Sequence, residues 1–386
     1  MNIKLFLKQY VKMAAQKVVL PVIYRRWRGE GVDPKLVILA DAHHNERPEN
    51  MRLLYEALKA APENYHIREM YLDYGRSSAG QVFRHMADFM KWYARASSVV
   101  ICDNFLPAAG CRKRPETQVI QLWHACGSLK RFGYDTTGDI PANYRGNVFR
   151  NTDVVTVSAP ACVPAFAGAM RLPREAVQPL GVSRTDRYAD PAWAAACREK
   201  FERLYPQAAG RKIVLWAPTF RGSPGAPVVE LPDLERLSRE LGEETRLIVR
   251  LHPHMKEAAG QLSAEMTAEG MTTEELFAVT DVLIADYSSL IFEYLLFGGR
   301  LVRYAPDLEH YIKERGFYLD YSSIPGELVL EEPKLAPAVR RALETEETPE
   351  EAQKRKQFLQ RYMSACDGHA TQRVAELIRK HGESIR

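Results

Sequence analysis

The fold class is decided by one stretch near residue 290, which reads DVLIADYSSLIFEYLLFGG over residues 281–299. Its first part is a short apolar run closed by Asp286, as in a buried strand of a sheet. A polar turn follows, and the apolar run of residues 290–297 continues as a helix that ends at two glycines. A strand that leads through a polar turn into a helix is typical of a parallel sheet with crossover helices.

The same alternation of short apolar runs and longer amphipathic stretches extends along the chain. We expect a helix at residues 49–61 and a strand that ends at His124. The full set of expected strands is residues 36–40, 98–102, 118–123, 154–158, 212–217, 246–251 and 281–286. The series predicts an α/β fold, in which ligands bind beyond the carboxyl ends of the strands.

The length of the chain and a change in its local composition both predict two domains. The chain has 386 residues, about twice the usual domain size, and its texture changes over residues 187–210 to an alanine-rich helix and a Pro/Gly turn. The economical architecture is a pair of doubly wound, Rossmann-like halves with a cleft between them. We expect an N-terminal domain at residues 29–200, a C-terminal domain at residues 211–345 and a helical tail at residues 346–386.

Composition excludes several classes of protein. With 46% hydrophobic residues, 26% charged residues and a net charge of +4, the chain is ordinary globular material without the charge of a bulk nucleic-acid binder. The six cysteines include no CxxC pair and no Cys/His cluster with metal-ligand spacing, so reduced thiols, no metal and no cofactor are expected. No apolar run approaches the roughly 20 residues that span a bilayer, and no signal peptide is expected.

The first 28 residues stand apart because they carry seven basic residues and no acidic one. Five apolar residues recur at helical spacing, namely Ile3, Phe6, Leu7, Tyr10 and Met13, while Lys4, Lys8 and Lys12 fall on another side. Such a basic amphipathic helix suits an anionic membrane surface, which predicts a peripheral protein at the cytoplasmic face of the cell membrane. The alternative is a helix docked on its own domain.

A first polar cluster follows the expected strand at residues 118–123. There His124 is followed by a Gly/Ser turn and by the cations Lys130 and Arg131. Because imidazole titrates near neutral pH, His124 is suited to accept a proton from an attacking hydroxyl group next to a bound phosphate. A histidine that only caps a turn is the alternative.

Three more clusters follow later strands. Thr219, beside Pro218 and Arg221, offers a hydroxyl and a cation to a phosphate, although such turns are also common in structure alone. In Arg250-Leu251-His252-Pro253-His254, Arg250 and His252 fall on the same side of a strand and suit a diphosphate. The two histidines also resemble a zinc-binding pair, but the sequence offers no third and fourth ligand.

In the last cluster, Ser288 or Ser289 is expected to cap a helix whose first two turns include Glu293. The free amides at such a helix start can cradle a phosphate, and an ordinary capped helix is the alternative. A nucleophilic serine is not expected, because the Gly-x-Ser-x-Gly pattern is absent.

Six motifs in this order resemble the CDP-glycerol glycerophosphotransferase family, the teichoic acid primases and polymerases, over roughly residues 35–340. They are Gln121-Leu122-Trp123-His124, Gly181-Val182-Ser183-Arg184-Thr185-Asp186, Ala217-Pro218-Thr219-Phe220-Arg221, Arg250-Leu251-His252-Pro253, residues 281–289 and residues 315–321. The resemblance implies a GT-B-like fold in which the last helix crosses back to the first domain. It also implies a CDP-glycerol or CDP-ribitol donor held mainly by the second domain.

The resemblance assigns roles at matching positions. His124 would be the catalytic base, and His252 would stabilise charge on the phosphates. The substrate-binding residues would be Trp123, Arg184, Pro218, Thr219, Arg221, Arg250, Leu251, Ser288, Ser289 and Glu293. The sequence departs from the family's common pattern at Ala125-Cys126-Gly127 and at Ser183, which bears on the identity of the donor and acceptor.

The expected reaction is transfer of a polyol phosphate to a hydroxyl of a lipid-linked, membrane-associated acceptor, with release of CMP, in teichoic acid or capsule synthesis. Two alternatives remain open. One is a nucleotide-sugar glycosyltransferase of the same fold, and the other is a non-catalytic membrane- or glycan-binding protein. No nucleic-acid partner is expected, and the pattern leaves the oligomeric state open.

Overall fold

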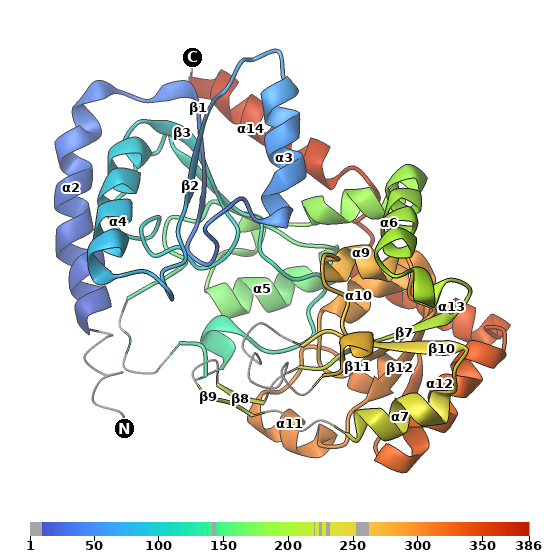
Figure 1. Cartoon of the computed structure of the whole chain (residues 1–386). Helices are drawn as coiled ribbons and strands as arrows, with labels where there is room; N and C mark the ends of the chain where they lie inside the picture. The colour runs from blue at the N-terminus through green and yellow to red at the C-terminus, as the bar shows by residue number, and fades with distance from the viewer. Residues whose placement is uncertain are drawn as a thin grey trace. The chain divides into compact units, whose positions relative to one another are not determined.

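The computed structural model describes residues 10–136, 138–140, 144, 146–219, 221–223, 226–228, 232–251 and 262–385. They form two compact α/β units (Figure 1). Unit 1 consists of the chain up to Ala125, Phe132–Asp186 and Ser364–Arg386. Unit 2 consists of Cys126–Arg131 and Arg187–Met363.

Unit 1 is built on a six-stranded parallel sheet of order β2-β1-β3-β4-β5-β6. The strands are β1 (Asp33–Asp41), β2 (His66–Tyr71), β3 (Ala96–Ile101), β4 (Gln118–Gln121), β5 (Val154–Thr156) and β6 (Val177–Gln178). The helices are α2 (Leu20–Trp27), α3 (Glu49–Ala60), α4 (Ala79–Tyr93), α5 (Val163–Met170) and α14 (Ala370–Ile385).

Strand alternation gives the central sheet of unit 1 two apolar faces. Ile38 and its even-numbered neighbours in β1 pack with residues of α2 and α4, whereas Val37 and Leu39 pack with residues of α3 and α14. Figure 1 shows α2 beside α4 and α14 beside α3. Helices therefore cover both faces, as parallel sheets require, and leave the carboxyl edge of the strands for loops.

Unit 2 repeats the plan with a five-stranded parallel sheet of order β10-β7-β11-β12-β13. The strands are β7 (Lys212–Ala217), β10 (Thr245–Val249), β11 (Val282–Ala285), β12 (Arg300–Tyr304) and β13 (Glu327–Val329), with a separate hairpin of β8 (Arg221–Ser223) and β9 (Ala226–Val228). The helices are α6 (Pro191–Leu204), α7 (Leu234–Leu241), α9 (Thr273–Phe277), α10 (Leu290–Tyr294), α11 (Leu308–Glu314), α12 (Leu335–Glu344) and α13 (Pro349–Tyr362).

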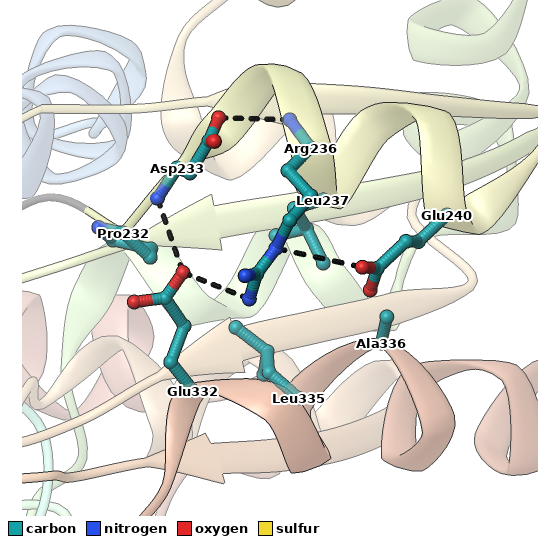
Figure 2. A pocket seen from close by; sticks show the side chains of 8 residues that line it. All are labelled: Pro232, Asp233, Arg236, Leu237, Glu240, Glu332, Leu335 and Ala336. Atoms are coloured by element: carbon teal, nitrogen blue, oxygen red, sulfur yellow. Dashed lines mark hydrogen bonds and ion pairs between the residues drawn. The ribbon is translucent and has the colours of Figure 1, made fainter.

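Helices α7 and α12 are tied together by charge at the surface of unit 2. Arg236 lies 3.4 Å from Glu240 on its own helix and 3.1 Å from Glu332, just before α12 (Figure 2). Asp233 caps α7 by accepting the N–H of Arg236 at 2.9 Å. The hollow between these side chains holds about 10 Å³, room for no more than about one water molecule. It is part of the packing of the two helices and too small to be a ligand site.

The predicted α/β class is confirmed, and each expected strand is present in the structure. The strand expected to reach His124 ends earlier, at Gln121, because Trp123 has a left-handed backbone with φ 59° that no strand continues through. Strands β2, β6, β12 and β13 were not predicted. β6 and β13 are two and three residues long, and β12 includes the buried Arg303, whose guanidinium donates to the carbonyls of Tyr321 and Gly326.

The units divide between Asp186 and Arg187, earlier than the boundary expected near residues 200–210. The reason is that α6 packs on α9, where Lys200 lies 2.8 Å from Glu275, so α6 belongs to unit 2. The tail is two helices: α13 belongs to unit 2, whereas α14 belongs to unit 1 and contacts α3. Asp186 caps α14 by accepting the N–H groups of Ala370 and Thr371 at 3.0 and 2.7 Å.

The described part of the N-terminal segment is helical from Tyr10, with a π-helical turn at Ala15–Val19 that leads into α2. Its inner side packs on unit 1, where Leu20 and Tyr24 are buried and the amide of Gln16 donates to the carbonyls of Ala109 and Asn147. The predicted apolar positions Ile3, Phe6 and Leu7 lie outside the described residues. Among the residues described, no helix is long and apolar enough to cross a membrane.

Gly127 occupies a position where the backbone is left-handed and space is absent. Its φ is 65°, and an added Cβ would lie 2.4 Å from the ring of Phe292. Gly210 has a similar φ of 76° but nothing within 4 Å of an added Cβ. We expect Gly210→Ala to lower the free energy of unfolding by about 1 kcal/mol through backbone strain alone.

Gly127→Ala should cost about 1–3 kcal/mol more than Gly210→Ala, because overpacking adds to the strain. Urea unfolding of the two variants measures the difference. Equal losses would show that the ring of Phe292 moves aside without cost.

Candidate active site

Three loops with titratable side chains lie at the carboxyl edge of the unit 1 sheet. Strands β1, β3 and β4 are neighbours, so the residues that follow them meet at one edge. There the Nδ1 atom of His124, after β4, lies 3.0 Å from the Oδ2 atom of Asp103, after β3. The imidazole lies against the indole ring of Trp123, with ring centroids 4.4 Å apart, and its side chain is 52% exposed. His124 is therefore oriented by a carboxylate yet open to solvent.

Asp103 is a carboxylate that no sequence motif singled out. Burial alone would raise its pKa, but attraction and hydrogen bonding to His124, together with His43, outweigh burial and hold the pKa at about 2. The lowered pKa contributes to the stability of the folded protein at pH values above the ordinary pKa near 3.9. This contribution is lost as the pH falls toward 2. Asp103 is therefore ionised at neutral pH. An Asp directly after a buried strand, opposite a strand-end His, was the signal available in the sequence.

The loop after β1 adds two more histidines to this edge. His43 Nε2 lies 3.9 Å from Asp103, and Asp41 accepts the backbone N–H groups of His43 and His44 at 2.7 and 3.0 Å. Asp41 also hydrogen-bonds to His44 Nδ1, which raises the pKa of His44. Neither histidine was singled out from the sequence, because their place beside Asp103 depends on the order of the strands.

The backbone beneath His124 is strained and held by buried polar groups. The left-handed conformation of Trp123 costs about 1–3 kcal/mol for a bulky side chain. The amide of Asn50 donates to the carbonyl of Trp123 at 2.6 Å, and Arg184 donates to the carbonyl of His124 at 3.1 Å and to Asn50. The direction of His124 is thus fixed by contacts to its backbone as well as to its ring.

Trp123 and Arg184, both predicted to bind substrate, lie in unit 1. The indole of Trp123 is only 6% exposed and packs against Phe132 and Phe166, so it is a support for His124. Arg184 is buried in unit 1, and its part in substrate binding stays a prediction. Its guanidinium donates to the side chain of Asn50 and to the carbonyl of His124.

Unit 2 presents a second set of strand-end groups. Strands β10, β7 and β11 are neighbours, which brings together the residues after Ala217, Val249 and Ala285. The backbone N–H of Thr219, next to Pro218, donates to Asp286 at 3.0 Å. The predicted clusters after β7 and β11 are therefore in direct contact.

The guanidinium of Arg221 forms ion pairs with two carboxylates. Its guanidinium binds Asp307 through two hydrogen bonds of 2.6 and 2.9 Å and Asp286 through one of 2.9 Å, and Tyr287 donates to Asp307 at 2.8 Å. Burial opposes its charge, but these carboxylates keep the pKa of Arg221 above its usual range. Arg221 thus holds the loops after β7 and β11 together, and its part in phosphate binding stays a prediction.

Arg250 also points to protein groups. Its guanidinium donates to the carbonyls of Ala268 and Met271, and burial lowers its pKa. Leu251 is half-buried against the core of unit 2. The second predicted catalytic residue, His252, and the nearby His254 lie outside the described residues.

The turn before α10 keeps hydroxyl groups at the edge of the sheet. Ser288 accepts the N–H of Leu290 at 3.3 Å, whereas the hydroxyl of Ser289, at the N-cap position, does not cap the helix. Glu293 is fully buried and accepts a hydrogen bond of 2.8 Å from Tyr188. Glu293 therefore fixes the helix from within. In the part of the chain that the structure describes, no group of three His, Cys, Asp or Glu side chains is arranged to hold a metal ion.

Comparison with known proteins matches the chain to one family. Residues 22–380 match the family described as CDP-Glycerol:Poly(glycerophosphate) glycerophosphotransferase. The chain is 32% identical over 357 residues to a teichoic acid ribitol-phosphate primase of Bacillus spizizenii, covering 89% of this chain and 90% of that protein. It is 30% identical to a teichoic acid glycerol-phosphate primase of Bacillus subtilis, covering 73% of each.

Longer relatives are matched over part of their length. The ribitol-phosphate polymerase TarK of Staphylococcus aureus is 33% identical, and the chain spans about half of it, 56%. The solved structure of the wall teichoic acid polymerase TagF matches with a TM-score of 0.72 at 21% identity over 98% of both chains, which shows the same GT-B-like fold. The chain belongs to the CDP-glycerol:poly(glycerophosphate) glycerophosphotransferase family.

Proposed function

We propose that this chain transfers glycerol phosphate or ribitol phosphate from a CDP-polyol to a hydroxyl group of a lipid-linked acceptor in teichoic acid synthesis. The single observation that carries the proposal is the pairing of His124 with Asp103 at the carboxyl edge of the unit 1 sheet. Family membership supplies the class of donor. A half-exposed imidazole bound to a carboxylate through one nitrogen leaves the other nitrogen to accept a proton.

The reaction is an in-line displacement at phosphorus. The acceptor hydroxyl gives its proton to Nε2 of His124 as its oxygen bonds to the β-phosphorus that carries the polyol. The bond from that phosphorus to the bridging oxygen breaks, and CMP leaves with the electron pair. Asp103 stabilises the imidazolium that forms. General-base catalysis of this kind contributes roughly 100- to 10,000-fold to the rate.

The donor diphosphate is proposed to bind at the edge of the unit 2 sheet. Thr219 and Ser289 bring hydroxyl groups to the turns that follow β7 and β11, and the ion pairs of Arg221 hold these turns. His252 remains proposed as the group that stabilises charge on the phosphates. Hydroxyl and imidazole donors suit phosphate oxygens that gain charge as the bond to CMP breaks.

Membrane association is proposed through the outer side of the helical segment that ends with α2. Val18 and Val22 lie one helical turn apart and are each 61% exposed, and the exposed Arg25 and Arg26 follow. Apolar side chains flanked by cations suit the interface of an anionic membrane. Because Leu20 and Tyr24 belong to the core, the outer valines are better targets for a test than a deletion of the segment.

We expect His124→Ala to lower kcat by about 100-fold or more and Asp103→Asn to lower it by about 100-fold, with donor binding retained. The measurement is CMP release from CDP-glycerol and from CDP-ribitol with a lipid-linked acceptor, with mass analysis of the product. His66 and Asp33 offer a matched control, because they form a similar pair, 2.8 Å apart, where Asp33 begins β1. His66→Ala and Asp33→Asn should leave kcat unchanged.

Near-full activity of His124→Ala would remove His124 as the base. Release of UDP or GDP from a nucleotide sugar, with no CMP from either CDP-polyol, would identify a glycosyltransferase instead. Binding of CDP-polyols without any release of CMP would identify a binding protein.

Replacing Val18 and Val22 together by Glu should reduce sedimentation with phosphatidylglycerol vesicles by at least about tenfold, since burial of apolar area is lost and like charges repel. Leu330→Glu is the control, because Leu330 is an exposed apolar residue of unit 2. Equal sedimentation of the two variants would contradict this surface as the membrane contact.

A further inference from the structure

Two buried polar side chains converge on the backbone that carries His124. Asn50, the second residue of α3, is 5% exposed, and Arg184, which follows β6, is 7% exposed. The Asn50 amide donates to the carbonyl of Trp123 at 2.6 Å and to Cys102 Sγ at 3.3 Å. Its own carbonyl oxygen accepts from Arg184. The chain thus brings α3, β4 and the segment after β6 to one pair of peptide groups.

These contacts oppose a backbone preference. A tryptophan does not favour the left-handed region, so the turn at Trp123 would relax toward extended or right-handed backbone without compensating bonds. Rotation of this one residue would turn the following Cα–Cβ bond and move the imidazole of His124 away from Asp103. The two carbonyls at residues 123 and 124 are the groups through which that rotation can be blocked, and both accept a side-chain hydrogen bond.

We propose that Asn50 and Arg184 are positioning residues that hold the left-handed turn and thereby aim His124 at the acceptor hydroxyl. The proposal rests on the proposed role of His124 as base. Arg184 then acts inside unit 1, through its bond to the carbonyl of His124. Asn50 acts through its bond to the carbonyl of Trp123, a role that its position in the sequence does not suggest. At metal sites, hydrogen bonds that orient a ligating histidine account for about 10- to 100-fold in activity, and we expect an effect of the same order here.

Asn50→Asp is the sharpest variant. It keeps the size of the side chain and an oxygen for Arg184, but it replaces the N–H donor by an oxygen facing the carbonyl of Trp123. We expect kcat to fall about 10- to 100-fold with the KM for the CDP-polyol unchanged within about twofold. Arg184→Lys should have the same signature with a smaller loss, because lysine keeps the charge but its single nitrogen lacks the guanidinium fork that reaches both acceptors.

The matched control is Asn151→Asp. Asn151 also lies in unit 1, and its amide also donates to two backbone carbonyls, those of Ala108 and Cys111, each at 2.8 Å. It makes these bonds to the loop after β3 and none of them to the turn at Trp123. Its kcat should stay within about twofold of the unchanged protein, while its thermal stability falls as much as that of Asn50→Asp.

A double-mutant cycle separates positioning from a merely structural role. If Asn50 acts through His124, then Asn50→Asp should have no further effect on the residual activity of His124→Ala. An equal fold-loss in both backgrounds would overturn the proposal, as would an unchanged kcat for Asn50→Asp or a rise in donor KM alone. Full activity of His124→Ala would instead overturn the proposed function, so the two failures are distinguishable.

Discussion

The left-handed turn at Trp123 is the constraint on which the arrangement of unit 1 around its candidate base depends. It ends β4 at Gln121, turns the chain out of the sheet and leaves His124 at the carboxyl edge, beside the loops that follow β1 and β3. A bulky residue keeps this conformation only where its surroundings oppose relaxation. Here the surroundings are the aromatic packing of Trp123, the hydrogen bonds of Asn50 and Arg184 to the backbone, and Asp103 at the ring.

In unit 2, buried charged groups hold the loops at the strand ends in place. Asp286 follows β11 and accepts hydrogen bonds from the backbone of Thr219 and Tyr287 and from Arg221. Asp307 binds the remaining face of the same guanidinium. Because a buried carboxylate without such partners would be costly, this network fixes the two loops whose hydroxyl groups are proposed to meet the donor. In both units, precision at a strand end comes from charged and amide groups beneath the surface.

The sequence was most informative where structure is local. Apolar runs such as residues 212–217 and 282–285 identified strands correctly, because a strand buried on both faces needs an uninterrupted apolar run. The strand-end rule then selected His124, Thr219 and Ser289. Short strands such as β6 gave too few residues for a pattern, and the charges in β12 concealed a buried strand.

Partners distant along the chain were not predictable. Asn50 lies 73 residues before Trp123, and Asp103 meets His124 only because β3 and β4 are neighbours in the sheet. The basic residues Arg184, Arg221 and Arg250 were recognised as cations near a site, but a sequence does not tell whether a guanidinium faces a ligand or a carbonyl. The structure shows all three bound to protein groups.

In the proposed site, Asp103 and the left-handed turn at Trp123 leave Nε2 of His124 open to take a proton. Nitrogen-15 NMR of the protein labelled at histidine tests this most directly, with His124→Ala used to assign the signal. For neutral His124 we expect the tautomer with the proton on Nδ1, donated to Asp103, and a mixture of tautomers when Asp103 is replaced by Ala. A neutral His124 with its proton on Nε2 would contradict it, because that nitrogen would have no lone pair for the acceptor's proton.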